Sequence, residues 1–192
     1  MSATNRGAIR NKDDYYATPA WAINQFLDSF FTDYNLPSVA RILDPCAGGD
    51  VERGMAYPAG LEQAGWRNIE TMDIRGDSPA MMHGVDYLKV SAPYAGQYDL
   101  IITNPPFKLA VEITRKALAD VKLGGFVVML QRLNWLGAQS RLPFWRENLP
   151  VSIYVHNKRL AFSNAKTTDS IEYAHFVFQS GNNPEFSKLK VL

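Results

Sequence analysis

The sequence predicts an α/β fold in which helices cover both faces of a mostly parallel β-sheet. Short apolar segments with strand character recur along the chain, and amphipathic segments with helical spacing separate them. Strands that alternate with helices in this way form parallel sheets covered on both sides. With 192 residues, of which 46% are hydrophobic and 20% charged, the chain has the size and composition of one ordinary globular domain.

The first helix has the clearest signal. Apolar residues between Pro19 and Phe31 fall at helical spacing, Thr18 is a candidate N-cap, and Pro19 suits the first helical position. The last two strands are joined by residues 156–172 without a clear helix, so we expect them to form an antiparallel addition to the sheet. The expected strands are residues 40–43, 69–72, a short one around 85, 99–103, 126–130, 151–155 and 173–178, and the expected helices are residues 19–31, 51–64, 109–121 and 135–148.

The expected organisation is a single domain with short flanking segments. Residues 1–13 are polar and basic and predict a flexible arm, residues 14–182 form the domain, and residues 183–192 form a tail. Residues 131–172 are the only sizeable segment outside the alternating core, and we expect a small substrate-facing segment within them. No apolar run approaches the roughly 18 residues that span a bilayer, and no signal peptide is recognisable. The sequence predicts a cytoplasmic monomer with no membrane partner.

The few cysteine and histidine residues exclude some classes of site. A single cysteine, Cys46, rules out an internal disulfide framework and suits a reducing compartment. His83, His156 and His175 are scattered, so no metal-ligand spacing is present and we expect no metal.

The charge is distributed unevenly although the net charge is only +1. Residues 1–103 carry 8 Lys and Arg against 13 Asp and Glu, whereas residues 104–192 carry 12 against 6. A basic half of this kind suits a polyanionic partner, although charges also fall unevenly along chains that bind none.

The most informative motif is Asn104-Pro105-Pro106-Phe107, which directly follows an apolar strand segment at residues 98–103. Proline has no N–H and restricts the residue before it to extended geometry. The Asn104 side-chain oxygen and the Pro105 carbonyl can therefore converge on one amino group, with Phe107 as a flat surface beside it. Such a pair of acceptors suits an exocyclic amine whose lone pair is delocalised into an aromatic ring.

Three further acidic or glycine-rich sites follow the earlier predicted strands. The segment Asp44–Asp50 follows the first strand and contains adjacent glycines that allow a ligand to approach the backbone. Asp73 ends the second strand, near the offset at which an acid meets ribose hydroxyls. Asp86 follows the third and can accept a hydrogen bond from an adenine amino group. The alternative for Asp73 and Asp86 is that each caps a helix, but their register with Gly49 and Asn104 favours ligand contacts. With Asn104, these groups lie at the carboxyl ends of successive strands, where open α/β sheets bind ligands.

In this order, the motifs resemble those of class I S-adenosylmethionine-dependent methyltransferases of the N6-adenine type, over about residues 14–180. The resemblance implies a Rossmann-like, seven-stranded, mostly parallel sheet with an antiparallel last strand. It also implies that S-adenosylmethionine is the cofactor and that a methyl group passes to the N6 amine of adenine in DNA. One departure is Asp50, which stands where the common pattern has glycine.

The resemblance also implies roles for individual residues. Asn104, Pro105, Pro106 and Phe107 would be catalytic, with Asn104 and Pro105 orienting the amine and Phe107 stacking on the base. The segment before the first helix would close over the methionine part of the cofactor, Asp73 would bind its ribose, and Asp86 its adenine. The implied cofactor-binding residues are Tyr16, Thr18, Pro19, Asp44, Pro45, Cys46, Ala47, Gly48, Gly49, Asp73, Ile74, Asp86, Tyr87 and Asn104.

Nucleic-acid contacts are expected from two places. Lys108 stands at a predicted helix start, where a cation opposes the helix dipole, which suggests an anionic partner. Residues 157–166 are basic with interleaved apolar residues and resemble a substrate-facing loop, in which Arg159 and Lys166 would hold phosphate and Phe162 would stack on a base. The alternative is a solvated hairpin loop.

Other functions fit the same motifs. Related motifs act on adenine or guanine amines in RNA, or on a glutamine amide in protein, and Phe107 favours a nucleobase without separating DNA from RNA. A catalytically silent cofactor- and DNA-binding module also stays open because of Asp50. The compactness of the chain resembles that of orphan enzymes from phages or prophages.

Overall fold

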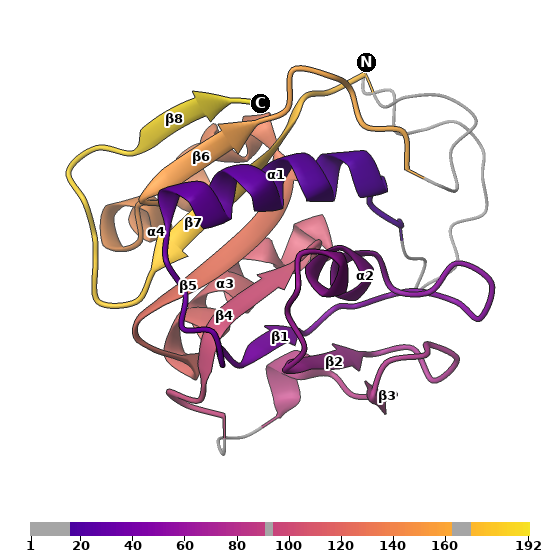
Figure 1. Cartoon of the computed structure of the whole chain (residues 1–192). Helices are drawn as coiled ribbons and strands as arrows, with labels where there is room; N and C mark the ends of the chain where they lie inside the picture. The colour runs from indigo at the N-terminus through magenta and orange to yellow at the C-terminus, as the bar shows by residue number, and fades with distance from the viewer. Residues whose placement is uncertain (1–15, 91–93, 163–169) are drawn as a thin grey trace.

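The computed structural model describes residues 16–90, 94–162 and 170–192, and an eight-stranded sheet forms its centre, in the order β3-β2-β1-β4-β5-β7-β6-β8 (Figure 1). Only β7 runs antiparallel to its neighbours, pairing with both β5 and β6. This confirms the predicted mostly parallel sheet with one antiparallel strand. The sheet has eight strands where seven were predicted, and the antiparallel strand is the last but one in the chain. The strands are β1 Ile42–Asp44, β2 Ile69–Asp73, β3 Met82–His83, β4 Tyr98–Thr103, β5 Val121–Arg132, β6 Ser152–Val155, β7 Tyr173–Gln179 and β8 Lys188–Val191.

Helices cover both faces of this sheet, as predicted. Alternate residues of β4 illustrate the two sides: Leu100 and Ile102 pack with α1 and α2, whereas Ile101 packs with α3 and α4. Both faces are therefore apolar, as expected for a doubly covered parallel sheet. The α-helices are α1 Ala20–Asp33, α2 Ala56–Gln63, α3 Ala110–Asp120 and α4 Leu142–Glu147, and the short 3-10 helices are η1 Tyr87–Lys89, η2 Phe107–Leu109, η3 Leu133–Leu136 and η4 Gln139–Arg141.

The second and fourth helices are shorter than the sequence predicts. Residues 51–54 form a turn instead of a helix, because the Asp50 carboxylate accepts the N–H groups of Glu52 and Arg53. The predicted helix at 135–148 is split into three short helices, η3, η4 and α4. Gly137 ends η3, and a proline lies in the first turn of α4. The third strand also lies slightly earlier than residue 85.

The predicted tail at residues 183–192 is wrong, because residues 188–191 form β8 and extend the sheet. β8 pairs in parallel with β6, from Ser152 opposite Lys188 to Val155 opposite Val191. All four of its residues are exposed. An edge strand held by backbone hydrogen bonds buries no apolar face, so its sequence shows little of the hydrophobic signal of a strand.

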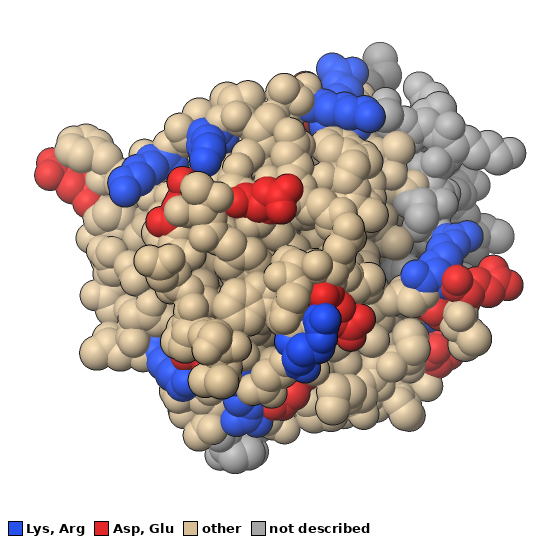
Figure 2. Space-filling view, in the orientation of Figure 1, with Lys and Arg blue, Asp and Glu red and all other residues tan. Residues whose placement is uncertain are grey.

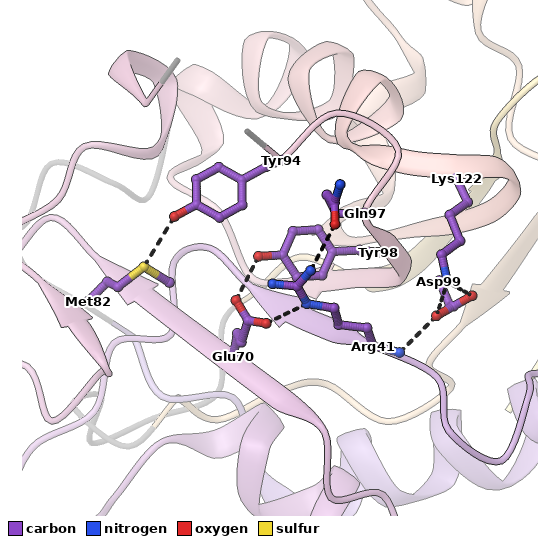
Figure 3. A network of polar contacts seen from close by, with 8 residues as sticks. All are labelled: Arg41, Glu70, Met82, Tyr94, Gln97, Tyr98, Asp99 and Lys122. Atoms are coloured by element: carbon purple, nitrogen blue, oxygen red, sulfur yellow. Dashed lines mark hydrogen bonds and ion pairs between the residues drawn. The ribbon is translucent and has the colours of Figure 1, made fainter. Parts of the chain in front are cut away.

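A polar network ties β1, β2 and β4 together at their amino ends (Figure 3). The Arg41 guanidinium donates to Glu70 Oε1 at 2.6 Å and lies over the Tyr98 ring at 4.9 Å. Tyr98 donates in turn to Glu70 Oε2 at 2.9 Å, and Asp99 accepts both the Arg41 backbone N–H and the Lys122 ammonium. Ion pairs and hydrogen bonds therefore occupy the amino ends of these strands. The candidate functional groups lie at the opposite, carboxyl ends.

Candidate functional site

The candidate site lies where β2, β1 and β4 end side by side. Asp73 is the last residue of β2, Asp44 is the last residue of β1, and Asn104 directly follows β4. These strands are adjacent in the sheet order, and their carboxyl ends point toward the segment that precedes α1 (Figure 1). The structure therefore brings together three groups that are spread over 60 residues of the chain, from Asp44 to Asn104.

Asn104 is fixed by two hydrogen bonds to that preceding segment. Its Nδ2 donates to the backbone carbonyl of Tyr16 at 3.1 Å and to Thr18 Oγ1 at 3.3 Å. Both bonds use the amide nitrogen, so Oδ1 is left as an acceptor for a group from outside. Thr18 is buried and does not act as the N-cap of α1, since Pro19 occupies that position without a side-chain cap. The predicted capping role of Thr18 is therefore wrong.

The two proline carbonyls of the motif have different roles. The Pro106 carbonyl accepts the Leu109 N–H at 2.9 Å and begins η2. Among the described residues, no backbone N–H bonds to the carbonyl of Pro105. The Pro105 carbonyl and Asn104 Oδ1 are therefore acceptors on consecutive residues at one strand end, and their convergence on one amine stays a prediction.

Phe107 is half-buried, and Arg132 covers one side of it. The Arg132 guanidinium lies 4.9 Å from the centre of the Phe107 ring, and its Nε donates to the Tyr173 hydroxyl at 3.2 Å. The Tyr173 ring is also tilted against Phe107, with ring centres 6.0 Å apart. These contacts restrict the orientation of the ring, three residues after Asn104 in the chain. The sequence interpretation missed Arg132, although a cation ending a buried strand is a visible signal.

Asp44 presents an unpaired carboxylate oxygen in the interior. The residue is 1% exposed, and its Oδ1 accepts the Cys46 N–H at 3.2 Å. Its Oδ2 makes no hydrogen bond of good geometry among the described residues, although the Thr103 hydroxyl lies close enough to lower the pKa of this carboxyl. Burial raises the pKa of this carboxyl to about 7. An orphaned acceptor at this depth indicates a position for a donor from a ligand.

The glycine loop is shaped by left-handed backbone conformations and by Asp73. Gly48 and Gly49 have φ angles of 59° and 81°, and a Cβ on Gly49 would lie 2.7 Å from the Gly54 carbonyl oxygen. Asp73 Oδ2 accepts the Gly48 N–H at 2.7 Å, and its Oδ1 accepts the Arg75 N–H at 2.8 Å. Asp73 therefore fixes the loop as well as ending the strand.

The contacts of Asp50 show how the loop accommodates an aspartate where the common pattern has glycine. Its carboxylate caps the following turn, and its carbonyl accepts the Gly54 N–H at 2.9 Å. The turn closes back on Gly49, which keeps the positive φ angle that the tight loop requires. Glycine at residue 50 is therefore unnecessary for the loop to form.

The side chains that follow β2 and β3 differ in where they point. Ile74 is 53% exposed, so its apolar side chain is available beside Asp73. Asp86 caps η1 through the Leu88 N–H and pairs with Lys89 at 3.1 Å, which bears out the alternative that it is a cap. Tyr87 is buried and its hydroxyl donates to Asp120 at 2.8 Å, so its side chain lies in the core, and its cofactor role stays a prediction.

The other predicted cofactor residues line the same edge. Pro45 and Ala47 are buried in the loop after β1. Cys46 is half-buried, and burial raises the pKa of its thiol, which leaves it un-ionised and unsuited to nucleophilic attack. Tyr16 is 40% exposed and Pro19 is half-exposed at the start of α1.

Only some of the residues expected to contact nucleic acid are exposed. Lys108 is exposed beside Phe107, and Arg159 is exposed and pairs with Glu172 at 3.5 Å. Phe162 is only 6% exposed and packs edge-on against Tyr173, so its ring is a core element and does not project outward. Lys166 lies outside the described residues.

The surface charge on the face seen in Figure 2 is mixed. Lys and Arg side chains of the described residues lie there singly or beside Asp and Glu, and form no continuous basic patch on that face. Within residues 16–90, 94–162 and 170–192, no group of three His, Cys, Asp or Glu side chains is placed to hold a metal ion. In the same ranges, no helix is long and apolar enough to cross a membrane.

Comparison with known proteins identifies the fold. No protein-family model and no curated protein sequence matches the chain. Among solved structures, an inferred class I S-adenosylmethionine-dependent methyltransferase from Listeria monocytogenes is 13% identical, with a TM-score of 0.64 over 96% of this chain and 68% of that one. An inferred RNA methyltransferase from Pyrococcus horikoshii is 14% identical, with a TM-score of 0.66 over 91% and 93%.

A third similar structure is that of a restriction endonuclease. The type IIG restriction endonuclease BpuSI is 14% identical, with a TM-score of 0.62 over 94% of this chain but only 27% of the endonuclease. Identities this low establish the architecture and not the substrate. The chain has the Rossmann-like fold of class I S-adenosylmethionine-dependent methyltransferases.

Proposed function

We propose that this protein transfers a methyl group from S-adenosylmethionine to the N6 amine of adenine in DNA. The observation that carries the proposal is the orientation of Asn104. Its Nδ2 is held by the Tyr16 carbonyl and the Thr18 hydroxyl, so Oδ1 would be available, with the carbonyl of the following Pro105, to accept from a substrate. Two fixed oxygen acceptors side by side suit an amine with two hydrogens.

The residues at the strand ends fit the proposed cofactor. The buried Asp44 Oδ2 lacks a donor, and the ammonium of a methionine group would supply one. Asp73 uses each carboxylate oxygen once, and an ionised carboxylate has about four acceptor positions, so it can also accept ribose hydroxyls. The exposed Ile74 offers an apolar surface for an adenine ring. When bound, the cofactor supplies an electrophilic methyl group on a sulfonium.

The chain's own residues contribute positioning and polarisation. Asn104 Oδ1 and the Pro105 carbonyl would each accept one hydrogen of the amine, which localises its lone pair on nitrogen and aims it. Holding both reactants in line and presenting preorganised acceptors are large sources of rate in enzymes. Neither an amide nor a carbonyl oxygen holds a proton at neutral pH, so the proton released after transfer passes to water.

Phe107 would stack on the target base. Because Arg132 lies over the ring at 4.9 Å, a base would have to stack on a part of the ring that Arg132 does not cover. A base inside a duplex cannot reach this position, so the adenine must leave the helix first. Lys108 and Arg159, both exposed, would contact the phosphates of the backbone.

RNA is the second candidate substrate. The similar structure from Pyrococcus horikoshii is an inferred RNA methyltransferase, whereas BpuSI is a restriction endonuclease. Adenine N6 carries the same two hydrogens in both nucleic acids, so the Asn104 acceptors do not discriminate between them.

The proposal is tested by methyl transfer to duplex DNA, single-stranded DNA and total RNA in parallel, with nucleosides identified by mass spectrometry. The expected product is N6-methyldeoxyadenosine, absent with Asn104→Ala. Methylated nucleosides found in RNA alone would show that RNA, and not DNA, is the substrate. S-adenosylmethionine binding without transfer to any nucleic acid would favour a silent binding module, and retained activity in Asn104→Ala would overturn the mechanism.

A further inference from the structure

Phe107, which begins η2, contacts the ends of two strands. Arg132 is the last residue of β5 and lies opposite Tyr173, the first residue of β7. In β5, Val128 and Leu130 pack in the same core cluster as Tyr173. Because side chains two residues apart share one face of a strand, Arg132 continues this face where the strand ends. Phe107 packs against the same cluster, so the arginine and the two rings meet at one place.

Arg132 contacts both rings. Its guanidinium carbon lies 4.9 Å from the centre of the Phe107 ring, and its Nε donates to the Tyr173 hydroxyl at 3.2 Å. The two ring centres are 6.0 Å apart. A guanidinium is planar and stacks on aromatic faces, and its hydrogen bond to Tyr173 restricts how it can turn. The Phe107 ring therefore cannot move away from this position without losing its contact with Arg132.

Tyr173 is itself held by a row of rings. Its ring centre lies 5.1 Å from that of Phe162, and the ring centre of Phe162 lies 6.1 Å from that of Tyr16, both pairs meeting edge-on. The Tyr16 backbone carbonyl accepts the Asn104 amide at 3.1 Å. One connected set of contacts therefore runs from the side chain that we assign to the target amine to the ring that we assign to the target base.

We propose that Arg132 is a positioning residue for Phe107, and that it holds the ring in the orientation on which the target base stacks. The inference rests on the proposed function, because the orientation of the ring matters for turnover only if a base stacks on it. A ring that is ordered in advance binds a base more tightly than a mobile ring, since less conformational entropy is lost on binding. Arg132 acts through Phe107 and needs no contact of its own with the substrate.

The rival role for an arginine at this place is a direct contact with a phosphate. Such a contact depends mainly on charge, so lysine would largely replace Arg132, and removing the charge would weaken the salt dependence of binding. It would also act on any strand with the same phosphates, whether or not the strand carries bases. Positioning of Phe107 instead requires the planar guanidinium and matters only for a strand that has bases to stack.

Two variants of Arg132 and one matched control test the proposal. Arg132→Gln removes the charge, and Arg132→Lys keeps the charge without the planar group. Arg115→Gln is the control, because the Arg115 guanidinium also lies over a phenylalanine ring, that of Phe144, at 5.7 Å. Phe144 belongs to the core cluster on the opposite face of the sheet. Thermal unfolding of all three variants is compared with that of the wild type before any other measurement.

The first readout is binding to a single strand of about twelve deoxyadenosines and to an abasic strand of the same length. The wild type should prefer the adenine strand. Both Arg132 variants should reduce that preference roughly three- to tenfold, as for the loss of one cation–π contact, with the affinity for the abasic strand unchanged. Arg115→Gln should bind both strands like the wild type. A wild-type preference in folded Arg132→Gln would overturn the proposal.

The same titrations at several salt concentrations separate the two roles of Arg132. Equal weakening on both strands in Arg132→Gln, with a smaller salt dependence and recovery in Arg132→Lys, would assign the residue to a phosphate and overturn the positioning role. A double-mutant cycle with Phe107→Leu tests whether Arg132 acts through the ring. In the Phe107→Leu background, Arg132→Gln should cause no further loss of the adenine preference, and additive losses would refute the proposal.

The second readout does not depend on any substrate. The NMR signals of the Phe107 ring, assigned by their absence in Phe107→Leu, report how fast the ring rotates. In Arg132→Gln we expect the rotation to be roughly three- to tenfold faster, and in Arg115→Gln to be unchanged. If the wild type neither transfers a methyl group nor prefers the adenine strand, the proposed function fails, and this readout alone decides whether Arg132 positions the ring. An unchanged Phe107 ring in folded Arg132→Gln would overturn the positioning role.

Discussion

The Asp73 carboxylate binds the Gly48 N–H at 2.7 Å and thereby joins the end of β2 to the glycine loop after β1. The same side chain accepts the Arg75 N–H at 2.8 Å, so one buried carboxylate organises two backbone segments. A residue predicted from sequence as a ribose ligand therefore also builds the site. This double role makes its substitution informative.

Asp73→Asn should impair both stability and cofactor binding. An amide has only one oxygen for the two backbone N–H groups, and its NH2 would face one of them. We expect a loss of about 1–3 kcal/mol in the free energy of unfolding and a Kd for S-adenosylmethionine raised at least about tenfold. Denaturant unfolding and calorimetric titration measure the two effects. Asp77→Asn is the control, since the Asp77 side chain is 79% exposed, and a similar effect there would contradict the prediction.

Asp44→Asn should stabilise the protein at high pH while weakening cofactor binding. Burial raises the pKa of Asp44 from 3.8 to about 7, so the folded state holds a proton that the unfolded state releases. Wild-type stability from this group is therefore present below pH 4 and lost as the pH rises to 7. At pH 8 we expect the variant to be more stable by about 1 kcal/mol or more, with no difference near pH 4. Unfolding at both pH values tests this, and equal differences at both would refute it.

Acid should destabilise the protein through its buried histidines. The pKa of His156 is lowered from 6.5 to about 4, so the unfolded state binds a proton that the folded state does not. Stability from His156 is present above pH 6.5 and lost as the pH falls to 4, by at most about 1.4 kcal/mol per pH unit. His156→Gln keeps a side chain that can hydrogen-bond to His175 without this titration. Its stability curve should therefore fall less steeply than the wild-type curve between pH 6.5 and 4, and parallel curves would argue against the assignment.

Arg41→Ala should lower stability without affecting the site. Its guanidinium binds Glu70 and Gln97 and lies over Tyr98 (Figure 3). Arg41 precedes the first residue of β1, whereas Asn104 follows the last residue of β4. Because the Arg41 side chain is 35% exposed, we expect a loss of only about 1 kcal/mol in the free energy of unfolding. The Kd for S-adenosylmethionine should stay unchanged. A raised Kd in the folded variant would show that the two edges of the sheet are coupled.

Much of the fold follows directly from local sequence patterns. The apolar runs that became β1, β2, β4, β5, β6 and β7 are recognisable because buried parallel strands need apolar residues on both faces. The strand-end positions of Asp44, Asp73 and Asn104 are equally visible, since each polar residue interrupts or directly follows an apolar run. β8 was missed because an exposed edge strand is held by its backbone and buries no apolar face.

The sequence by itself determined the fold class, the order of the strand-end groups and the acceptor motif at Asn104. Only the tertiary structure decided which way each side chain points. Tyr87 turns into the core and Phe162 is buried, whereas Thr18 leaves the expected cap to hold Asn104. The physical reason is that apolar burial depends on local periodicity, but hydrogen-bond partners such as Tyr57 and His175 lie 118 residues apart and meet only after folding.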